Sequence, residues 1–405
     1  MTDNIFIKTQ ITMNKKFVIS IVALLNVLFF SQMTQATQPQ FLSYAEKTLD
    51  AIYQLYATDN HYLLREAFPF ESAQRATYLD NEEQADKHKP YAYLWPFSGS
   101  LSAVNTLNTA VQTNKYKQFF DDKVLPGLEL YFDTLRAPAA YASYLHITPL
   151  PDRFYDDNVW IGIDFTDMYL QTKDPHYLEK AKIVWRFIES GTDEQLGGGI
   201  YWVEQRKRSK HACSNAPGAV YALKLFEATG DSYYFEKGKA WYVWTKTHLQ
   251  DPTDFLIYDN IRLNGSVDKK KYAYNSGQMI EAAALLYKFS KDTAYLREAQ
   301  QIAESAYQYF FQDFSPKKGE AFHLLNKGNV WFSAVMLRGY IALYHQDGNK
   351  KYMDNFKVNL DYAWKHMRDQ NGLFNTDWSG TTQDKSKWLL TQFAMVEMYA
   401  RMSNL

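Results

Sequence analysis

A tyrosine that recurs at nearly constant spacing constrains the fold of this chain more than any other feature. Tyr116, Tyr177, Tyr234, Tyr295 and Tyr352 are separated by 61, 57, 61 and 57 residues. Four of them follow a short turn built from Lys, Asp, Gly, Asn or Pro, and each opens a segment with apolar residues at helical spacing. A repeat of this length indicates supersecondary pairs that stack on one another.

Each repeat contains two helices of different character. The helix after the tyrosine is amphipathic, whereas the helix before the turn is apolar on nearly every side, as in residues 219–228 and 282–286. A helix that is apolar all round lies in a buried position, and an amphipathic helix lies at a surface. We therefore expect buried helices near residues 98–112, 158–172, 215–229, 276–290, 329–345 and 386–402, and outer helices near residues 41–57, 116–134, 176–190, 233–248, 294–312 and 351–368.

The two sets of six helices predict an all-α fold, a closed (α/α)6 toroid in which the first outer helix pairs with the last buried one. The alternative is an open solenoid of helical pairs, which needs polar caps at both ends. Residues 388–402 are too apolar for such a cap. Closure is therefore favoured, and residues 37–405 are expected to form a single domain.

The connections between helices differ in length according to the rim on which they lie. Those from a buried helix to the next outer helix are short, whereas those in the other direction span residues 58–97, 135–157, 191–214, 249–275, 313–328 and 369–385. Long connections in a compact domain are usually functional. They gather where the buried helices begin, and the positive ends of the helix dipoles favour ionised carboxylates there. We expect the functional site on that rim.

The N-terminal segment has the layout of a secretory signal peptide. Lys15 and Lys16 precede an apolar run over residues 17–30, which is followed by small residues up to Ala36. We therefore expect residues 1–36 to be an upstream extension plus a signal peptide that starts at Met13. The mature chain is then exported to a periplasm or secreted, without a membrane anchor, and is expected to be a monomer. The single cysteine, Cys213, excludes an intrachain disulfide and is interpreted as a lone buried thiol.

Composition narrows the classes of partner and cofactor. The 44 basic and 45 acidic residues are evenly mixed and leave a net charge of −1, which argues against nucleic acid as a partner because phosphate binding needs a basic face. The nine histidines show no metal-binding spacing, and no nucleotide motif is present, so no metal and no cofactor are expected. Aromatic residues make up 17% of the chain. Most belong in the core, and some are expected to line a sugar cleft.

Two adjacent acids, Asp156 and Asp157, open the second buried helix between Tyr155 and Trp160. One interpretation is structural, with one acid as an N-cap and the other as a dipole partner. The other interpretation is catalytic. An uncompensated acid at the mouth of a buried helix is costly, and repulsion between neighbouring carboxylates separates their pKa values. A retaining glycosidase needs such a pair, one group ionised and one able to donate a proton.

Polar and aromatic residues accompany the acids on the same rim. The glycine run 197–199 lacks the Lys-Ser/Thr of a phosphate loop and is interpreted as a tight turn that presents Tyr201 and Trp202 to the cleft. At the other helix starts, helix capping is sufficient to explain four small polar residues: Ser98, Ser214, Asn275 and Asn329.

Four segments together resemble glycoside hydrolase family 76. They are Tyr-Asp-Asp-x-x-Trp at 155–160, Gly-Gly-Gly-Ile-Tyr-Trp at 197–202, Cys-Ser-Asn-x-Pro-Gly-Ala-Val at 213–220 and Tyr-Asn-Ser-Gly-Gln at 274–278. The resemblance extends from about residue 40 to the end and is greatest to members from mannan-using Bacteroidetes. It implies an (α/α)6 catalytic domain, a retaining endo-α-1,6-mannanase activity on mannan or manno-oligosaccharides, Asp156 as nucleophile and Asp157 as general acid/base.

Nine further residues are candidates for contacts with the sugar chain, because they are aromatic or polar and belong to the long connections or helix starts of this rim: Trp95, Tyr155, Tyr201, Trp202, Asn215, Asp259, Tyr274, Asn275 and Gln278.

Other functions remain compatible with the sequence. A cell-wall transglycosylase would use the same two aspartates, and a non-catalytic glycan-binding protein would keep the aromatic rim without needing both acids. A sugar epimerase on the same toroid would need a histidine pair on the buried helices. His211, His248 and His323 do not lie on the predicted buried helices.

Overall fold

The computed structural model describes residues 39–70, 78–80, 89–111, 113–146, 150–317 and 319–405. The expected signal peptide, including Met13 and Ala36, lies outside the described residues.

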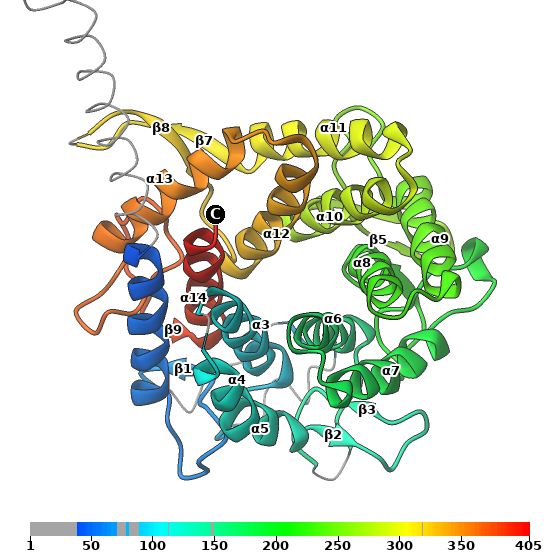
Figure 1. Ribbon diagram of the computed structural model, residues 1–405, viewed down its shortest axis with the longest axis horizontal. Helices are drawn as coiled ribbons and strands as arrows, with labels where there is room; N and C mark the ends of the chain where they lie inside the picture. Colours follow the sequence, from blue (N-terminus) through cyan, green and yellow to red (C-terminus); the bar gives the residue numbers. More distant parts are fainter. Residues whose placement is uncertain (1–38, 71–77, 81–88, 112, 147–149, 318) are drawn as a thin grey trace, which may run out of the picture.

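In the described part of the chain, six helices form the inner ring of the molecule (Figure 1). Each packs against the next, and the last contacts the first, so the ring is closed. Their residues are buried on almost every side, as the sequence pattern predicted. The inner helices are α3 (Leu94–Ala110), α6 (Tyr155–Thr172), α8 (Ala212–Thr229), α10 (Ala273–Ser290), α12 (Val330–Asp347) and α14 (Leu389–Ser403). The predicted all-α toroid is confirmed.

An outer layer surrounds this ring. It consists of the helix over residues 39–55, the segment α4 (Lys115–Phe119), η1 (Phe120–Val124) and α5 (Leu125–Glu129), and the helices α7 (Pro175–Ser190), α9 (Ser232–Leu249), α11 (Thr293–Tyr309) and α13 (Lys351–His366). The first outer helix closes the circle as predicted, because Phe41 and Tyr44 pack their rings against Tyr399 of α14.

The short turns between inner and outer helices explain the repeat in the sequence. A residue in the left-handed conformation ends each of four inner helices, namely Lys173, Gly230, Lys291 and Gly348. After three of these turns an aspartate caps the outer helix by accepting a hydrogen bond from a backbone N–H two residues later: Asp174, Asp231 and Asp292.

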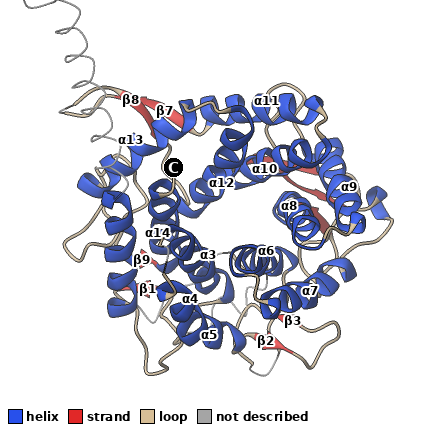
Figure 2. Ribbon diagram, viewed as in Figure 1, coloured by secondary structure: helices blue, strands red, loops and turns tan. Residues whose placement is uncertain are grey.

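The long connections carry short antiparallel strands at the opposite rim (Figure 2). These are β1 (Ala67–Phe68) with β9 (Lys387–Trp388), β2 (Phe132–Asp133) with β3 (Ala140–Tyr141), the three-stranded set β4 (Ser209–His211), β5 (Tyr258–Arg262) and β6 (Val267–Lys271), and β7 (Phe311–Phe314) with β8 (Phe322–Leu325). The turn η2 (Gln195–Gly197) holds the glycine run. The pairing of β1 with β9 joins the first long connection to the last.

Four inner helices begin three or four residues earlier than predicted, and this corrects the expected caps. Asn329 caps α12 as expected, whereas Ser98, Ser214 and Asn275 lie inside their helices rather than at the N-cap. Carbonyl groups of neighbouring connections take over the capping role at several starts. Thus the N–H of Tyr155 donates to the carbonyl of Trp202 at 2.9 Å. A helix start that is satisfied by tertiary backbone contacts needs no polar cap residue.

Polar groups also cross the buried interior of the ring. Arg338 of α12 donates two hydrogen bonds to Glu397 of α14 at 2.7 and 2.8 Å, and Ser102 donates to Asp164 at 2.7 Å. Burial raises the pKa of Asp164 to about 7. Burial also acts to raise the pKa of Glu397, but Arg338 and Arg401 lower it to about 2.

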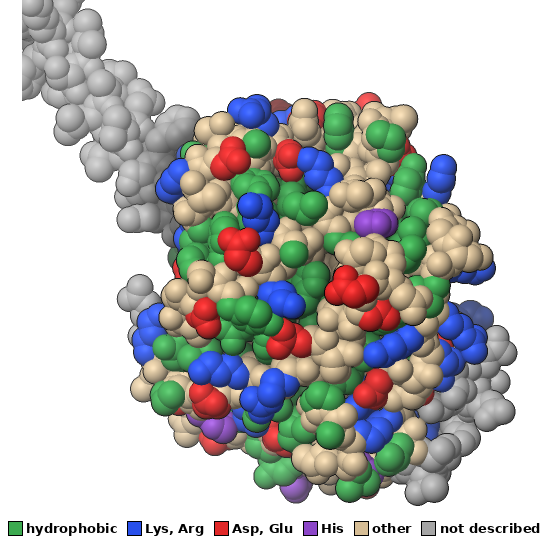
Figure 3. Space-filling model, turned by 90° about the vertical axis from the view of Figure 1, so that its right-hand side faces the viewer, with side chains coloured by type: hydrophobic (Ala, Val, Ile, Leu, Met, Phe, Trp, Pro, Cys, Tyr) green, Lys and Arg blue, Asp and Glu red, His purple; other side chains and the backbone are tan. Residues whose placement is uncertain are grey.

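The outer surface mixes acidic, basic and apolar side chains, as the face in Figure 3 shows. The large exposed apolar side chains are spread over distant segments, from Tyr62 to Val358. None of the helices in the described ranges is both long enough and apolar enough to cross a bilayer.

Candidate active site

A cavity of about 700 Å³ opens where the inner helices begin. The size is typical of a small-molecule or oligosaccharide site. Its wall is mainly aromatic, with acidic and amide groups between the rings. The lining residues are Tyr78, Leu79, Asp80, Tyr93, Trp95, Ser143, Phe154, Asp156, Asp157, Trp160, Trp202, His211, Cys213, Asp259, Lys270, Tyr272, Tyr274, Asn329, Trp331, Phe332 and Trp388.

The helical register of the toroid selects most of these residues. The N-cap residues of all six inner helices line the cavity: Tyr93, Phe154, His211, Tyr272, Asn329 and Trp388. The second residue of five inner helices lines it as well: Trp95, Asp156, Cys213, Tyr274 and Trp331. Equivalent positions of the inner helices all face the axis of the ring. The residue at which each inner helix begins therefore decides which of its side chains meet in the cavity.

Asp156 is held by side chains from two other segments. Its Oδ2 accepts a hydrogen bond from Nε1 of Trp202 at 3.0 Å and another from Sγ of Cys213 at 3.3 Å. Its Oδ1 has no hydrogen-bond partner among the described residues. Burial raises the pKa of Asp156, and the two donors act in the opposite direction by stabilising the carboxylate.

Asp157 lies in a different environment, although it is the next residue of α6. No side chain in the described ranges donates a hydrogen bond to its carboxyl group. Burial, together with the negative charge of Asp156, raises the pKa of Asp157 well above its usual value. Of the two carboxyl groups, Asp156 is therefore the one that ionises more readily, and Asp157 is the one whose environment favours the protonated form.

Trp202 is fixed from both sides. Its ring stacks on His211 with centroids 4.7 Å apart and contacts Phe154 at 5.1 Å. Burial lowers the pKa of His211 to about 3, so this imidazole is neutral near pH 7. A neutral, stacked imidazole supports the indole without placing a further positive charge beside Asp156.

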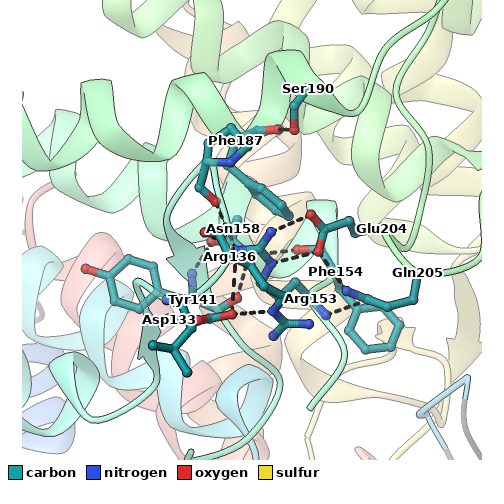
Figure 4. Close-up of polar contacts among 12 residues, drawn as sticks. Asp133, Arg136, Tyr141, Arg153, Phe154, Asn158, Phe187, Ser190, Glu204 and Gln205 are labelled. Carbon is teal, nitrogen blue, oxygen red and sulfur yellow. Dashed lines mark hydrogen bonds and ion pairs between the residues drawn. The ribbon is translucent and has the colours of Figure 1, made fainter. Parts of the chain in front are cut away.

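A buried arginine anchors the segment that leads into α6 (Figure 4). Arg153 donates from Nε to Glu204 at 2.7 Å and from Nη1 to the carbonyl of Pro138 at 2.9 Å, and its guanidinium lies over the ring of Phe187. Arg153 immediately precedes Phe154, the N-cap of α6. Such a charge-assisted network restricts the backbone that carries the two acids.

Four of the nine residues expected to contact sugar line the cavity together with the acid pair: Trp95, Trp202, Asp259 and Tyr274. Tyr274 stacks on Phe332 with centroids 4.1 Å apart, so its ring forms part of a flat wall. Burial raises the pKa of Asp259, while a hydrogen bond from Asn260 acts in the opposite direction. Asp259 is thus a second acidic group facing the same cavity.

Tyr155 and Tyr201 do not line the cavity that contains the acid pair. Tyr155 precedes Asp156 by one helical position and points to the outer layer, where its ring stacks on Phe187 at 4.6 Å. Tyr201 precedes Trp202 in an extended segment, in which successive side chains point in opposite directions. Its ring is buried and its hydroxyl donates to Asp193 at 2.7 Å.

Asn215 is also absent from the cavity wall, and its contacts show a structural role. Its Oδ1 accepts from the N–H of Ile200 at 2.6 Å, and its Nδ2 donates to the carbonyl groups of Ile200 and His211. Asn158, at the equivalent fourth position of α6, bonds in the same way to the N–H and carbonyl of Tyr141. These asparagines clamp the long connections to the inner helices.

Asn275 and Gln278 are not among the residues that line the cavity. Both are fully buried in α10. The amide of Asn275 makes no hydrogen bond of ordinary geometry in the described part of the chain, but it acts on the carboxyl group of Asp259, whose pKa it lowers. Gln278 lies about one turn deeper and donates from Nε2 to Glu281 at 2.7 Å.

Several cavity residues were not predicted from the sequence, notably Tyr78, Cys213 and Trp388. Tyr78 and Trp388 share one partly buried carboxylate, because Glu66 accepts from the hydroxyl of Tyr78 at 2.6 Å and from Nε1 of Trp388 at 2.7 Å. Cys213 could have been found by aligning the starts of the inner helices, since it occupies the position of Asp156 one repeat later. No comparable signal marks Tyr78, which lies within a long connection and away from the helix starts.

No group of three His, Cys, Asp or Glu side chains in the described ranges is arranged to hold a metal ion. The chemistry available is that of two carboxyl groups in unlike environments among aromatic rings, at the mouth of a closed ring of helices. A fold and a site of this kind define the class of protein, a glycosidase built on a closed toroid of helices.

The comparisons with known proteins give the family. The profile of Glycosyl hydrolase family 76 matches residues 71–404, and the chain belongs to this family. A family 76 mannosidase of Bacteroides thetaiotaomicron is 33% identical, with a TM-score of 0.81 over 90% of this chain and 98% of that one. An α-1,6-mannanase of Salegentibacter, 23% identical over 90% and 99% of the two chains, has a TM-score of 0.70. It was solved with α-1,6-mannotriose as an inactive variant in which two consecutive aspartates are asparagine.

Fungal relatives match over shorter segments. A mannan endo-1,6-alpha-mannosidase of Candida albicans is 26% identical over 159 residues, which cover 36% of this chain and 35% of that protein. The matches cover less than half the length of the fungal relatives.

Proposed function

We propose that this glycosidase cleaves α-1,6-mannosidic bonds within mannan or manno-oligosaccharides, with retention of anomeric configuration. Asp156 acts as nucleophile and Asp157 as general acid/base. The observation that carries the proposal is the unequal environment of two consecutive carboxyl groups facing one aromatic cavity. Two donors hold Asp156, whereas burial and the neighbouring charge favour the protonated form of Asp157.

The reaction proceeds in two displacements. In the first, the carboxylate of Asp156 attacks the anomeric carbon while Asp157 gives its proton to the 6-oxygen of the departing mannosyl residue, so that a glycosyl ester forms and the glycosidic bond breaks. In the second, Asp157 removes a proton from water, the resulting hydroxide attacks the anomeric carbon, and the ester bond to Asp156 breaks. The two inversions give net retention.

The cavity wall suits a chain of pyranose rings. Trp95, Trp331 and Trp388 lie close together, with Trp95 perpendicular to the other two rings at 5.5 and 5.3 Å. Such rings can stack on the apolar C–H faces of sugars, and the hydroxyl groups can be bound by Asp259 and Lys270, which also line the cavity. The α-1,6-mannan specificity is supported by the Salegentibacter and Candida relatives, whose activity is directed at this linkage.

The roles of the two acids can be separated by replacing each with asparagine. On linear α-1,6-mannan, Asp156→Asn is expected to lose turnover by roughly a thousandfold or more, and Asp157→Asn by about 10²- to 10⁴-fold. On an aryl glycoside of α-1,6-mannobiose, whose leaving group needs no proton, the first step of Asp157→Asn should recover, while Asp156→Asn should stay inactive. Asp122→Asn provides a matched control, because Asp121 and Asp122 form another acid pair in a first helical turn, on the outer layer.

Product analysis distinguishes the competing functions. NMR of the first product should show the α-anomer, and inversion would contradict the double displacement. Products longer than the substrate would indicate the transglycosylase instead of the hydrolase. If the unmodified protein bound manno-oligosaccharides but did not cleave them, it would be a non-catalytic glycan-binding protein.

We further propose that the chain acts outside the cytoplasm, in a periplasm or secreted, as a monomer. The charged and apolar pattern before residue 37 supports the first part of this proposal, export from the cytoplasm. N-terminal sequencing of the protein recovered from expressing cells tests it, and a retained segment 17–30 would contradict cleavage near Ala36.

A further inference from the structure

Cys213 is the only cysteine of the chain, and it contacts the carboxyl group to which the proposed reaction assigns the nucleophilic attack. It is the second residue of α8, the position equivalent to that of Asp156 in α6. Its Sγ lies 3.3 Å from Oδ2 of Asp156, on the same oxygen that Trp202 binds. The side chain is almost fully buried and lies in the wall of the cavity.

We propose that Cys213 is a positioning residue of the reaction, whose thiol donates a hydrogen bond to Asp156 and orients its carboxylate toward the anomeric carbon. This inference rests on the proposed function. Two donors on one oxygen, Trp202 from the connection before α8 and Cys213 from α8 itself, fix the rotation of the carboxylate about its last torsion. A side chain held this way reaches the reacting geometry without a further loss of rotational freedom.

The thiol remains a donor at neutral pH. Burial raises the pKa of Cys213 well above its usual value, and the negative charges of Asp156 and Asp259 act in the same direction. The sulfur therefore keeps its proton and donates it in a hydrogen bond to the carboxylate of Asp156. The titratable groups around this contact are Asp157 on α6, Asp259 on β5, Tyr274 on α10 and His211, the N-cap of α8.

The weakness of a thiol donor fits a nucleophile. An S–H group is a weaker donor than a hydroxyl, so it orients the carboxylate while withdrawing little of its negative charge. A serine at position 213 would donate more strongly and lower the basicity of Asp156. An alanine at position 213 would remove the thiol donor and leave Trp202 as the remaining donor to Oδ2 of Asp156.

The contact can be tested on the resting protein without substrate. Because the chain has one cysteine, its S–H stretching band in the infrared spectrum is assigned without ambiguity. We expect the band at lower frequency in the unmodified protein than in Asp156→Asn, and we expect it to move to higher frequency as acid protonates Asp156. A band that responds neither to pH nor to Asp156→Asn would overturn the inference.

The kinetic test follows the acid limb of kcat/KM on α-1,6-mannan. Loss of a donor disfavours the ionised carboxylate, so Cys213→Ala should raise the pKa of this limb by roughly half to one pH unit and lower kcat several-fold with little change in KM. Cys213→Ser should return the limb to the wild-type value or below it. Ser214→Ala is the matched control, because Ser214 is its buried neighbour and its hydroxyl has no hydrogen-bond partner in the described ranges.

The two tests keep this inference separate from the proposed function. An unchanged acid limb in both Cys213 variants of an active enzyme would refute the positioning role and leave the mannanase proposal standing. An unmodified protein that does not cleave α-1,6-mannan would refute the proposed function, while the infrared titration would still show whether the thiol bonds to Asp156.

Discussion

Replacing Asn215 with alanine separates the structural role of this residue from the sugar contact that the sequence suggested. The side chain makes three hydrogen bonds, at 2.6, 2.8 and 2.8 Å, two of them to the backbone of Ile200. Leaving a buried donor or acceptor unpaired costs about 1–3 kcal/mol, a figure that already includes the hydrogen bond lost. With the N–H and carbonyl of Ile200 both unpaired, we expect the free energy of unfolding to fall by about 2–6 kcal/mol.

Urea unfolding followed by circular dichroism measures this change. Asn275→Ala is the control, because Asn275 is equally buried but makes no hydrogen bond to the backbone of a long connection; a smaller loss is expected there. If Asn215→Ala had the wild-type midpoint of urea unfolding and a higher KM, Asn215 would bind substrate. The structural role that we assign to its hydrogen bonds would then be wrong.

Three further variants test other parts of the structure. Tyr201→Phe should leave KM for manno-oligosaccharides unchanged in initial-rate measurements, because its ring points away from the cavity; a several-fold rise would return Tyr201 to the binding site. Gly199→Ala should lower the thermal midpoint, since φ is +84° and a Cβ would lie 2.5 Å from the ring of Trp244; an unchanged midpoint would refute the close approach. Glu397→Gln should cost about 3–5 kcal/mol of stability by leaving Arg338 unpaired in the interior. Because the folded pKa of Glu397 is lowered to about 2, its stabilisation is complete above its ordinary pKa and is lost as pH falls toward 2, so the wild-type and Glu397→Gln stabilities, measured by urea unfolding, should converge over that interval.

Much of the fold follows from patterns that act locally. The recurring tyrosine and the Asp turns predicted the outer helices to within a few residues, because capping and amphipathic spacing are properties of short segments. The helix starts on the active rim were less predictable. Ser98 and Ser214 look like caps in the sequence, yet helices α3 and α8 begin earlier, and backbone groups of distant connections replace side-chain caps at such starts, as at Tyr155.

The candidate site divides in the same way. The pair Asp156 and Asp157 was recognisable because two acidic side chains at the start of a buried helix are costly to bury without a compensating partner. Cys213 was not, because its importance lies in a contact with a residue 57 positions away in the sequence. Tyr201 and Trp202 looked equivalent in the sequence, and only the direction of an extended segment decided which of them reaches the cavity.

The sequence by itself determined the number and kind of helices, the rim on which the site lies and the acid pair, because periodicity, turn chemistry and burial conflicts are written in neighbouring residues. The tertiary structure decided which side chains face the axis and which support them from behind. That choice depends on the register between helices, and a shift of one position turns a helical side chain by about 100°, from the cavity into the packed layer behind it.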